Sequence, residues 1–197
     1  MITATVGSVC ARTAPLSDRA AHDAAEALGQ QWFGPNFDEA RFDDWARRVE
    51  HLLFVAEGAA TGEFLGYADQ LFIAPHVDVA LRAGTISEEA FGIDAILDDA
   101  AMHAMPAGTR VTLYLAGMCV TAPRTPVGHE AARALRACRR ALLAQWRGRG
   151  LEVTMLMAAA TVAGRTIATR AGGVLIGPAD ARVDGYDLYE LRELPDN

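Results

Sequence analysis

The amino-acid sequence predicts an α/β (α+β) fold, with a mixed, largely antiparallel sheet, a central parallel pair of strands and flanking helices. Residues 51–57 and 63–74 have the pattern of two strands around the Gly-containing turn 58–62, which is typical of an antiparallel hairpin. Residues 111–120 are apolar on both alternations, as in a central strand buried on both faces. A helical pattern separates them from a second buried strand, 151–157, and this order of elements requires a parallel crossover.

The elements before the hairpin are predicted from local signals. Residues 2–10 are rich in β-branched side chains and predict one strand. Ser17 is a suitable N-cap for an Ala-rich helix that we expect to stop near Gly29, and a second helix is expected over residues 37–50. Aromatic side chains concentrate in this region, where they either pack the helices together, which we favour, or line a ligand pocket: Trp32, Phe33, Phe37, Phe42 and Trp45.

The remaining elements follow from helical spacing and from glycine stops. Residues 87–105 predict one helix, with Thr85 and Glu88 as a capping box. Further helices are expected over 129–147 and 161–171, and further strands over 174–177 and 186–194. A length of 197 residues favours a single domain, 1–197.

Composition excludes several classes of function. The net charge of −7 argues against a protein whose main affinity is for nucleic acid, because that affinity comes from neutralising phosphates. All 18 basic residues are Arg, so no lysine amine is available for chemistry. The three cysteines show no metal-ligand spacing, and we expect no metal site and reduced thiols. No signal-peptide or membrane-spanning pattern occurs, so we expect a cytoplasmic protein without a membrane partner.

The chain resembles the GNAT superfamily of acyl-CoA-dependent N-acyltransferases. The most specific part of the resemblance is LYLAGMCVTAPRTPVGHEAARALRACRRALLAQWRGRGLEVTMLM, which is similar to that family's central strand, pyrophosphate loop, long helix and fifth strand. AGRTIATRAGGVLIG is similar to the following helix and strand. The resemblance implies a GNAT-like domain with residues 75–110 as a helical insertion between the third and fourth strands. It also implies acetyl-CoA or another acyl-CoA as co-substrate.

The loop before the long helix is the expected binding site for that co-substrate. A Gly-containing loop at a helix N-terminus exposes backbone N–H groups at the positive end of the helix dipole, which suits a pyrophosphate. The resemblance assigns this role to Arg124, Thr125, Val127, Gly128 and His129. The motif is degenerate, because Val127 and His129 occupy the family's glycine positions and Pro126 lacks a backbone donor.

Other cofactor contacts are carried over from the family residue by residue. The family binds the thioester carbonyl through a backbone N–H of its central strand, which corresponds here to Cys119, flanked by Met118 and Val120. Arg133 could reach the nucleotide phosphates, and Thr161 stands where an Asn contacts the pantetheine arm. The family's Tyr general acid is missing, since the matching position holds Ala168 or Thr169.

An amine acceptor must be deprotonated, so the reaction needs a general base. The candidates are Glu57 and Asp69, together with Glu152, His76 and His103. Cys119 itself is better explained as a buried inert thiol than as a nucleophile, since the sequence places no His or acid beside it.

The function predicted from these residues is direct transfer of an acetyl or longer acyl group to a small-molecule or peptide amine in a ternary complex. One alternative is a catalytically degenerate GNAT-fold protein that binds a ligand or a partner. Another is an acyl-transfer synthase whose donor is an acyl-carrier protein received by the Arg-rich helix. A homodimer formed through the last strand or the aromatic region is compatible with each of these.

Overall fold

The computed structural model describes residues 1–33 and 39–191. The chain divides into two compact units. Unit 1 comprises Met1–Gln70 and Gly117–Gln145, and unit 2 comprises Leu71–Ala116 and Trp146–Asn197. The chain passes between the units inside strand β4 (Phe64–Ile73), strand β5 (Arg110–Val120) and helix α5 (Pro126–Gly148). A single domain over 1–197 stays a prediction.

The sheet has the mixed topology that the sequence predicts. Neighbouring strands follow the order β1-β2-β3-β4-β5-β6-β8-β7. The strands not yet bounded are β1 (Thr3–Val6), β2 (Val9–Thr13), β3 (Leu53–Gly58), β6 (Glu152–Ala159), β7 (Val174–Gly177) and β8 (Asp187–Leu191). β5 and β6 pair in parallel, whereas β1 to β4 pair antiparallel in sequence order. The fold class is therefore confirmed.

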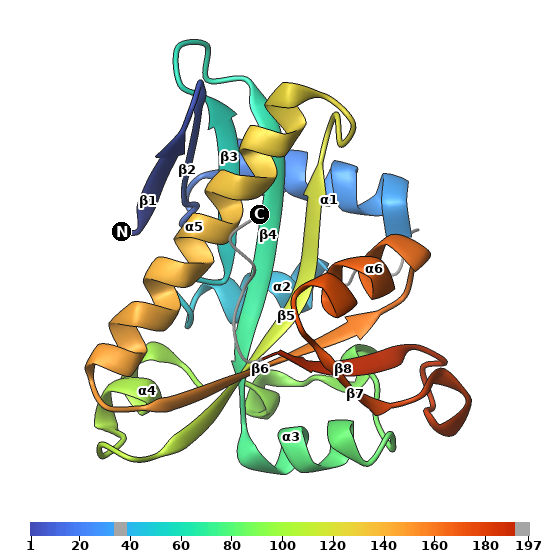
Figure 1. The fold of residues 1–197 in the computed structure, drawn as a ribbon. Helices are drawn as coiled ribbons and strands as arrows, with labels where there is room; N and C mark the ends of the chain where they lie inside the picture. Colours follow the sequence, from blue (N-terminus) through green and yellow to red (C-terminus); the bar gives the residue numbers. More distant parts are fainter. Residues whose placement is uncertain (34–38, 192–197) are drawn as a thin grey trace. The chain divides into compact units, whose positions relative to one another are not determined.

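Unit 1 is a sheet with a helix on each face. Leu53 and Val55 of β3 pack against α1 (Arg19–Phe33) in a buried cluster that also contains Leu28. Phe54 and Ala56 alternate to the other face, where α5 lies (Figure 1). The second helix, α2 (Glu39–Ala46), carries the buried Trp45. Each face of β3 is therefore covered, which explains its almost continuous apolar sequence.

Unit 2 contains the parallel pair. Its register runs from Arg110 opposite Glu152 to Tyr114 opposite Leu156. β6 also pairs antiparallel with β8, which pairs antiparallel with β7. Helix α6 (Val162–Arg170) contacts β6 and β8. The parallel arrangement of the two buried strands is confirmed.

The amino-terminal segment differs from the single strand predicted over residues 2–10. It forms a hairpin, in which β1 and β2 are joined at Gly7 and Ser8. Gly7 has a φ of +58°, a conformation that glycine adopts without strain. The following helix begins at Arg19, because the Asp18 carboxylate accepts a hydrogen bond from the Ala21 N–H and caps it.

The prediction of one helix over residues 87–105 is wrong. The insertion holds α3 (Pro75–Arg82), two short 3₁₀ turns (Glu88–Ala90 and Ile93–Ala95) and α4 (Asp99–Ala104). The capping box is also wrong, since Thr85 donates to the Ala80 carbonyl and Glu88 accepts from the Tyr114 hydroxyl. Long-range packing decides the outcome, because Phe91 is buried against Tyr114 and Ile96 bridges to Ile73.

Smaller differences occur at element ends. α1 runs past Gly29 to Phe33, and α5 begins three residues before the predicted His129. Phe37 lies outside the described residues. Within the described ranges, no helix is both long and apolar enough to cross a membrane.

Gly66 lies where β4 and β5 approach closely. A Cβ at this position would overlap the Cys119 carbonyl oxygen on β5. Gly66→Ala should therefore lower the free energy of unfolding by roughly 1–3 kcal/mol, as in other overpacked cores. Urea unfolding measures this loss. Gly148→Ala is the control, because a Cβ there has no neighbour within 4 Å, and its stability should match or slightly exceed that of the parent. Equal stability of both variants would contradict the close approach of β4 and β5.

Candidate functional site

The loop after β5 is closed by the cap of α5. The Thr125 hydroxyl donates to the Ala122 carbonyl at 2.9 Å and accepts from the Gly128 N–H at 3.2 Å. Pro126 follows as the first helical residue, where its missing N–H and fixed φ are tolerated. A Cβ at Gly128 would overlap the Ala122 carbonyl oxygen, so glycine is required where the helix meets the loop.

This cap removes donors from the helix N-terminus. Pro126 has no N–H, and the Gly128 N–H is already bonded to Thr125. The His129 N–H donates to the Thr125 carbonyl at 3.0 Å. The Val127 N–H, at the second helical position, is the donor of the first turn that these contacts leave available for an anion.

The first turn of α5 is fixed from the side by the β1–β2 hairpin. Glu130 accepts hydrogen bonds from both the N–H and the hydroxyl of Ser8, each at 2.9 Å. A Cβ at Gly7 would overlap the Glu130 carboxyl group. The hydrogen bonds from Ser8 hold the pKa of Glu130 below its usual value. The loop and helix start are therefore anchored to a strand distant in sequence.

At the carboxyl end of β5, the backbone N–H groups point alternately toward β4 and away from it. The Thr121 N–H donates to the Leu65 carbonyl on β4 at 3.0 Å. The Cys119 carbonyl lies against Gly66 of the same strand. Because peptide groups alternate along a strand, the N–H groups of Met118 and Val120 face away from β4. These two amides, rather than that of Cys119, are in position to meet a ligand.

Asp69 is buried on β4 beside Gly117 of β5. Its side chain lies on the α1 face, because Asp69 is paired with Leu53 in the sheet register. Burial raises the pKa of Asp69 to about 6, against the lowering effects of the Arg139 charge and of backbone N–H groups, including that of Gly117. Its Oδ1 has no hydrogen-bond partner among the described residues. A Cβ at Gly117 would overlap that oxygen, so glycine makes the room for it.

Tyr67 and Cys119 lie on the same face as Asp69. Both belong to the buried cluster that packs against α1. Burial raises the pKa of the Cys119 thiol to about 11, a hydrogen bond from Tyr67 lowers it, and the Asp69 charge raises it. A thiol with this pKa is protonated at neutral pH, which favours the inert role expected for Cys119. A Cβ at Gly29 of α1 would lie 2.8 Å from the Tyr67 hydroxyl oxygen, so this glycine also makes room.

Arg139 of α5 reaches the same two strands from the opposite face. It is 4 % exposed and donates to Gln70 Oε1 at 2.8 Å, to the Asp69 carbonyl at 2.8 Å and to the Gly117 carbonyl at 2.5 Å. Gln70 in turn donates to the carbonyl groups of His51 and Leu52 on the β3 side. Burial lowers the pKa of Arg139 to about 10, which leaves it charged at neutral pH.

A second group of cations lies on the outer side of α5. Arg133 is exposed, and the Nε atom of Arg136 is buried without a hydrogen-bond partner among the described residues. Burial and then the like charges of Arg140 and Arg133 lower the pKa of Arg136. An anion bound here would relieve this repulsion.

The other predicted bases have different surroundings. Both carboxylate oxygens of Glu57 accept from Arg12, at 3.0 and 2.7 Å, and this ion pair argues against a free base. Glu152 is exposed and pairs with Arg110 in unit 2. His76 is exposed, and His103 packs on Trp146 with a ring-centroid distance of 5.0 Å. Asp69 is the predicted base that lies beside Gly117, in the carboxyl-terminal half of β5.

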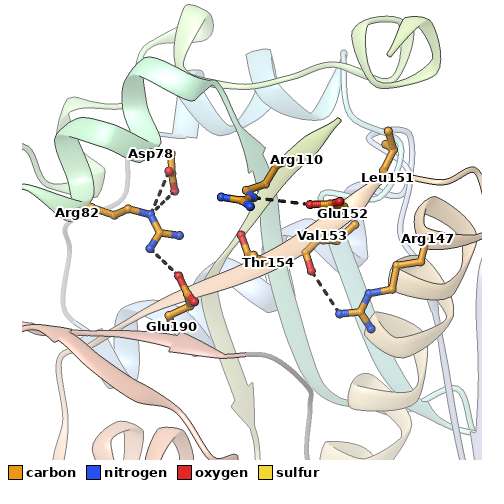
Figure 2. A pocket seen from close by; sticks show the side chains of 9 residues that line it. All are labelled: Asp78, Arg82, Arg110, Arg147, Leu151, Glu152, Val153, Thr154 and Glu190. Carbon is orange, nitrogen blue, oxygen red and sulfur yellow. Dashed lines mark hydrogen bonds and ion pairs between the residues drawn. The ribbon is translucent and has the colours of Figure 1, made fainter. Parts of the chain in front are cut away.

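Unit 2 contains an open cleft of about 760 Å³ (Figure 2). Three arginines and three acids line it, and the guanidinium groups already contact oxygen atoms. Arg82 binds Asp78 and Glu190, Arg110 faces Glu152, and Arg147 donates to the Val153 carbonyl. This charge-balanced cleft holds Glu152 but none of the predicted cofactor residues.

Among residues 1–33 and 39–191, no group of three or more His, Cys, Asp or Glu side chains could hold a metal ion.

Solved structures share this arrangement of strands and helices. A mosquito arylalkylamine N-acetyltransferase-like protein aligns with a TM-score of 0.59 at 14 % identity, covering 93 % of this chain and 99 % of its own. A GNAT-family acetyltransferase from Listeria monocytogenes aligns with a TM-score of 0.55 at 13 % identity, covering 95 % and 98 %. The NatC complex bound to Gag peptide and CoA aligns with a TM-score of 0.55 at 13 % identity, covering 96 % and 99 %. The chain has the GNAT fold. No protein-family model and no curated protein matches the sequence.

Among the remaining predicted residues, Thr161 lies in unit 2, whereas Arg124 and His129 lie in unit 1. Thr161 is the N-cap of α6, where its hydroxyl accepts from the Gly164 N–H at 3.0 Å. Ala168, one of the two positions that the resemblance matches to the family's Tyr, is fully buried and has no ionisable side chain. A pantetheine contact by Thr161 stays a prediction, as do the roles of Arg124 and His129, which are both exposed.

Three residues of this GNAT fold were missed by sequence reasoning. Tyr67 had a usable signal, since it stands two residues from Asp69 and so shares its strand face. Gly117 lies one residue from the segment that the resemblance singled out. Arg139 is one of five arginines on α5, and the sequence alone does not separate the inward-facing one from those on the outer side.

Burial of Asp69 predicts a stability that depends on pH. Because its folded pKa is raised to about 6, this group favours folding fully only below its unfolded pKa, near 4, and the contribution is lost as the pH rises through 6. Asp69→Asn should therefore match the parent below pH 4 and exceed it by roughly 2–3 kcal/mol above pH 6. Urea unfolding between pH 4 and 8 measures this difference.

The exposed Asp23→Asn is the control for the Asp69 measurement, because its substitution removes a carboxylate without relieving burial. Its difference from the parent should not change between pH 4 and 8. A flat difference for Asp69→Asn as well would show that Asp69 is not buried as an ion.

Proposed function

We propose that this protein transfers an acyl group from an acyl-CoA to an amine, with Asp69 as the general base. The observation that carries the proposal is the buried Asp69 carboxylate, whose Oδ1 lies beside Gly117 of β5 with no hydrogen-bond partner in the described part of the chain. A buried base with a pKa of about 6 is ionised at neutral pH and holds a proton better than an exposed carboxylate. The likeness in fold to acetyltransferases supports the reaction class.

The acyl-CoA would lie along the end of β5 and the start of α5. The Val127 N–H and the α5 dipole suit a pyrophosphate, and the outer cations Arg133 and Arg136 suit further phosphate groups. The N–H groups of Met118 and Val120 face away from β4 and can donate to the thioester carbonyl oxygen, where negative charge develops. All of these groups and Asp69 belong to unit 1.

The proposed reaction moves one proton from the amine to the thiolate. Asp69 removes a proton from the acceptor amine as its nitrogen attacks the thioester carbon, and the carbon–sulfur bond then breaks. Thiols have a pKa near 8.5, so a protonated Asp69 with a pKa of about 6 can return the proton to the departing thiolate. This route needs no separate acid, which fits the lack of a Tyr at either Ala168 or Thr169.

A second candidate function is ligand binding without transfer. It is favoured by the cap of α5, since Thr125 occupies the Gly128 N–H and Pro126 provides none. A phosphate cradle with fewer donors binds more weakly and positions the thioester less well. An acyl-carrier donor would instead be received by the Arg-rich face of α5.

Acyl-CoA binding can be tested with a charge at the loop. Val127→Glu places a carboxylate in the first turn of α5, where it favours the helix dipole but repels a pyrophosphate. Calorimetric titration with acetyl-CoA and octanoyl-CoA should show binding to the parent and at least tenfold weaker binding to the variant. Ala144→Glu carries the same added charge at an exposed site of α5 and should bind as the parent does. Absence of heat for the parent at millimolar ligand would reject acyl-CoA binding.

The role of Asp69 can be tested by kinetics. With a panel of amines, thiol release should follow a kcat/KM profile that falls about tenfold per pH unit below 6, because the protonated base is inactive. Asp69→Asn should lower kcat by roughly 10²–10⁴-fold and leave the Kd for acetyl-CoA within twofold of the parent. Asp23→Asn should retain full activity. Binding without thiol release by the parent would favour the second function, and full activity of Asp69→Asn would exclude this base.

A further inference from the structure

Arg139 is placed unlike the other cations of its helix. Arg133 is exposed on the outer side of α5, whereas Arg139 is 4 % exposed and faces the sheet. A buried guanidinium group is costly to desolvate, and it persists only where hydrogen bonds satisfy its donors. The burial of Arg139 inside unit 1 therefore indicates that it has a specific role.

The hydrogen bonds of Arg139 join the two strands that carry the proposed site. One terminal nitrogen donates to the carbonyl oxygens of both Asp69 and Gly117, at 2.8 and 2.5 Å, and Nε donates to Gln70 Oε1. These acceptors are neutral oxygens. The guanidinium group thus ties β4 to β5 at the residue that carries the base and at the residue that makes room for it.

The charge of Arg139 acts on the Asp69 carboxylate through the sheet. Each ion favours the charged form of the other, since Asp69 raises the pKa of Arg139 and Arg139 lowers that of Asp69. Among the other groups around Asp69, Tyr67 lies on the same strand, and Cys119 on β5 is protonated near pH 7. The neighbouring helix α1 contributes apolar side chains to this face, and the charge of its His22 acts on Asp18 and Asp43. The charge of Arg139 therefore opposes the increase that burial causes in the pKa of Asp69.

We propose that Arg139 is a positioning residue for acyl transfer, which holds Asp69 and the β5 backbone after Gly117 in their reacting arrangement. It touches neither substrate and acts through the main chain of the two strands and through its charge. The inference rests on the proposed function for its kinetic consequences. Its electrostatic consequence for Asp69 does not depend on any activity.

The effect of the Arg139 charge on Asp69 can be measured without any catalysed reaction. Carboxyl-carbon NMR of the protein labelled at aspartate gives the pKa of Asp69, assigned by comparison with Asp69→Asn. Arg139→Met should raise this pKa by at least one unit above the parent value. Arg139→Lys keeps the charge and should leave the pKa within half a unit. An unchanged pKa in a folded Arg139→Met protein would overturn the proposal.

The geometry is tested by kinetics on the same variants. Arg139→Lys cannot reproduce the planar set of three hydrogen bonds, so kcat should fall roughly 10- to 100-fold while the KM for acyl-CoA stays within twofold. The acid limb of kcat/KM should stay in place for Arg139→Lys and shift to higher pH for Arg139→Met. A purely structural tether would lower stability and leave both the kcat of the folded Arg139→Lys protein and the pH profile unchanged.

The controls separate this inference from the proposed function. Arg48→Met removes an exposed arginine of unit 1 outside α5 and should keep the parent Asp69 pKa and kcat. If the parent protein transfers no acyl group, the proposed function fails, and the NMR titration still decides whether Arg139 governs Asp69. If Arg139→Met does not fold, Arg139→Lys decides: parent kcat overturns the proposal, and reduced kcat with an unmoved Asp69 pKa supports it.

Discussion

The site of unit 1 depends on one electrostatic constraint: the Asp69 carboxylate and the Arg139 guanidinium group are buried on opposite faces of β4 and β5. Neither charge is stable alone in an apolar interior, because each would lose its hydration without compensation. Arg139 meets backbone oxygens on one face, and Asp69 stands beside Gly117 on the other. The position of β5 against β4 is thus coupled to the ionisation of Asp69.

Helix α5 connects this constraint to the candidate cofactor loop. Its first turn is capped by Thr125 and braced by the contact of Glu130 with Ser8, and its fourth turn carries Arg139. A helix held at both places would fix the distance between the phosphate end and the reacting end of the proposed thioester ligand. Glycine is required at Gly128, because a Cβ there would overlap the Ala122 carbonyl oxygen, whereas a Cβ at Gly7 would displace the Glu130 carboxyl group.

Elements and strand pairings with a regular apolar pattern were predictable from the sequence, and contacts of individual side chains with distant residues were not. The hairpin of β3 and β4 and the parallel pair of β5 and β6 followed from alternation and from apolar runs. The prediction of one helix over 87–105 was wrong because it rested on the spacing of Ala90, Ile93, Leu97 and Ala101. That spacing does not reveal the long-range contacts of Phe91 and Ile96. Asp69 and Glu57 looked equivalent in the sequence as acids on strands; the burial of Asp69 and the pairing of Glu57 with Arg12, which follows from the register of β2 and β3, appear only in the structure.

The absence of lysine has a chemical consequence at this site. A thioester acylates free amines slowly even without catalysis, and a lysine among the outer cations of α5 would be the nearest such amine. Arginine keeps its charge at every physiological pH and its delocalised guanidinium group is a poor nucleophile. Arg133 and Arg136 can therefore attract phosphate groups without competing for the acyl group. A surface whose positive charges are all guanidinium groups is protected from the reagent that it is proposed to bind.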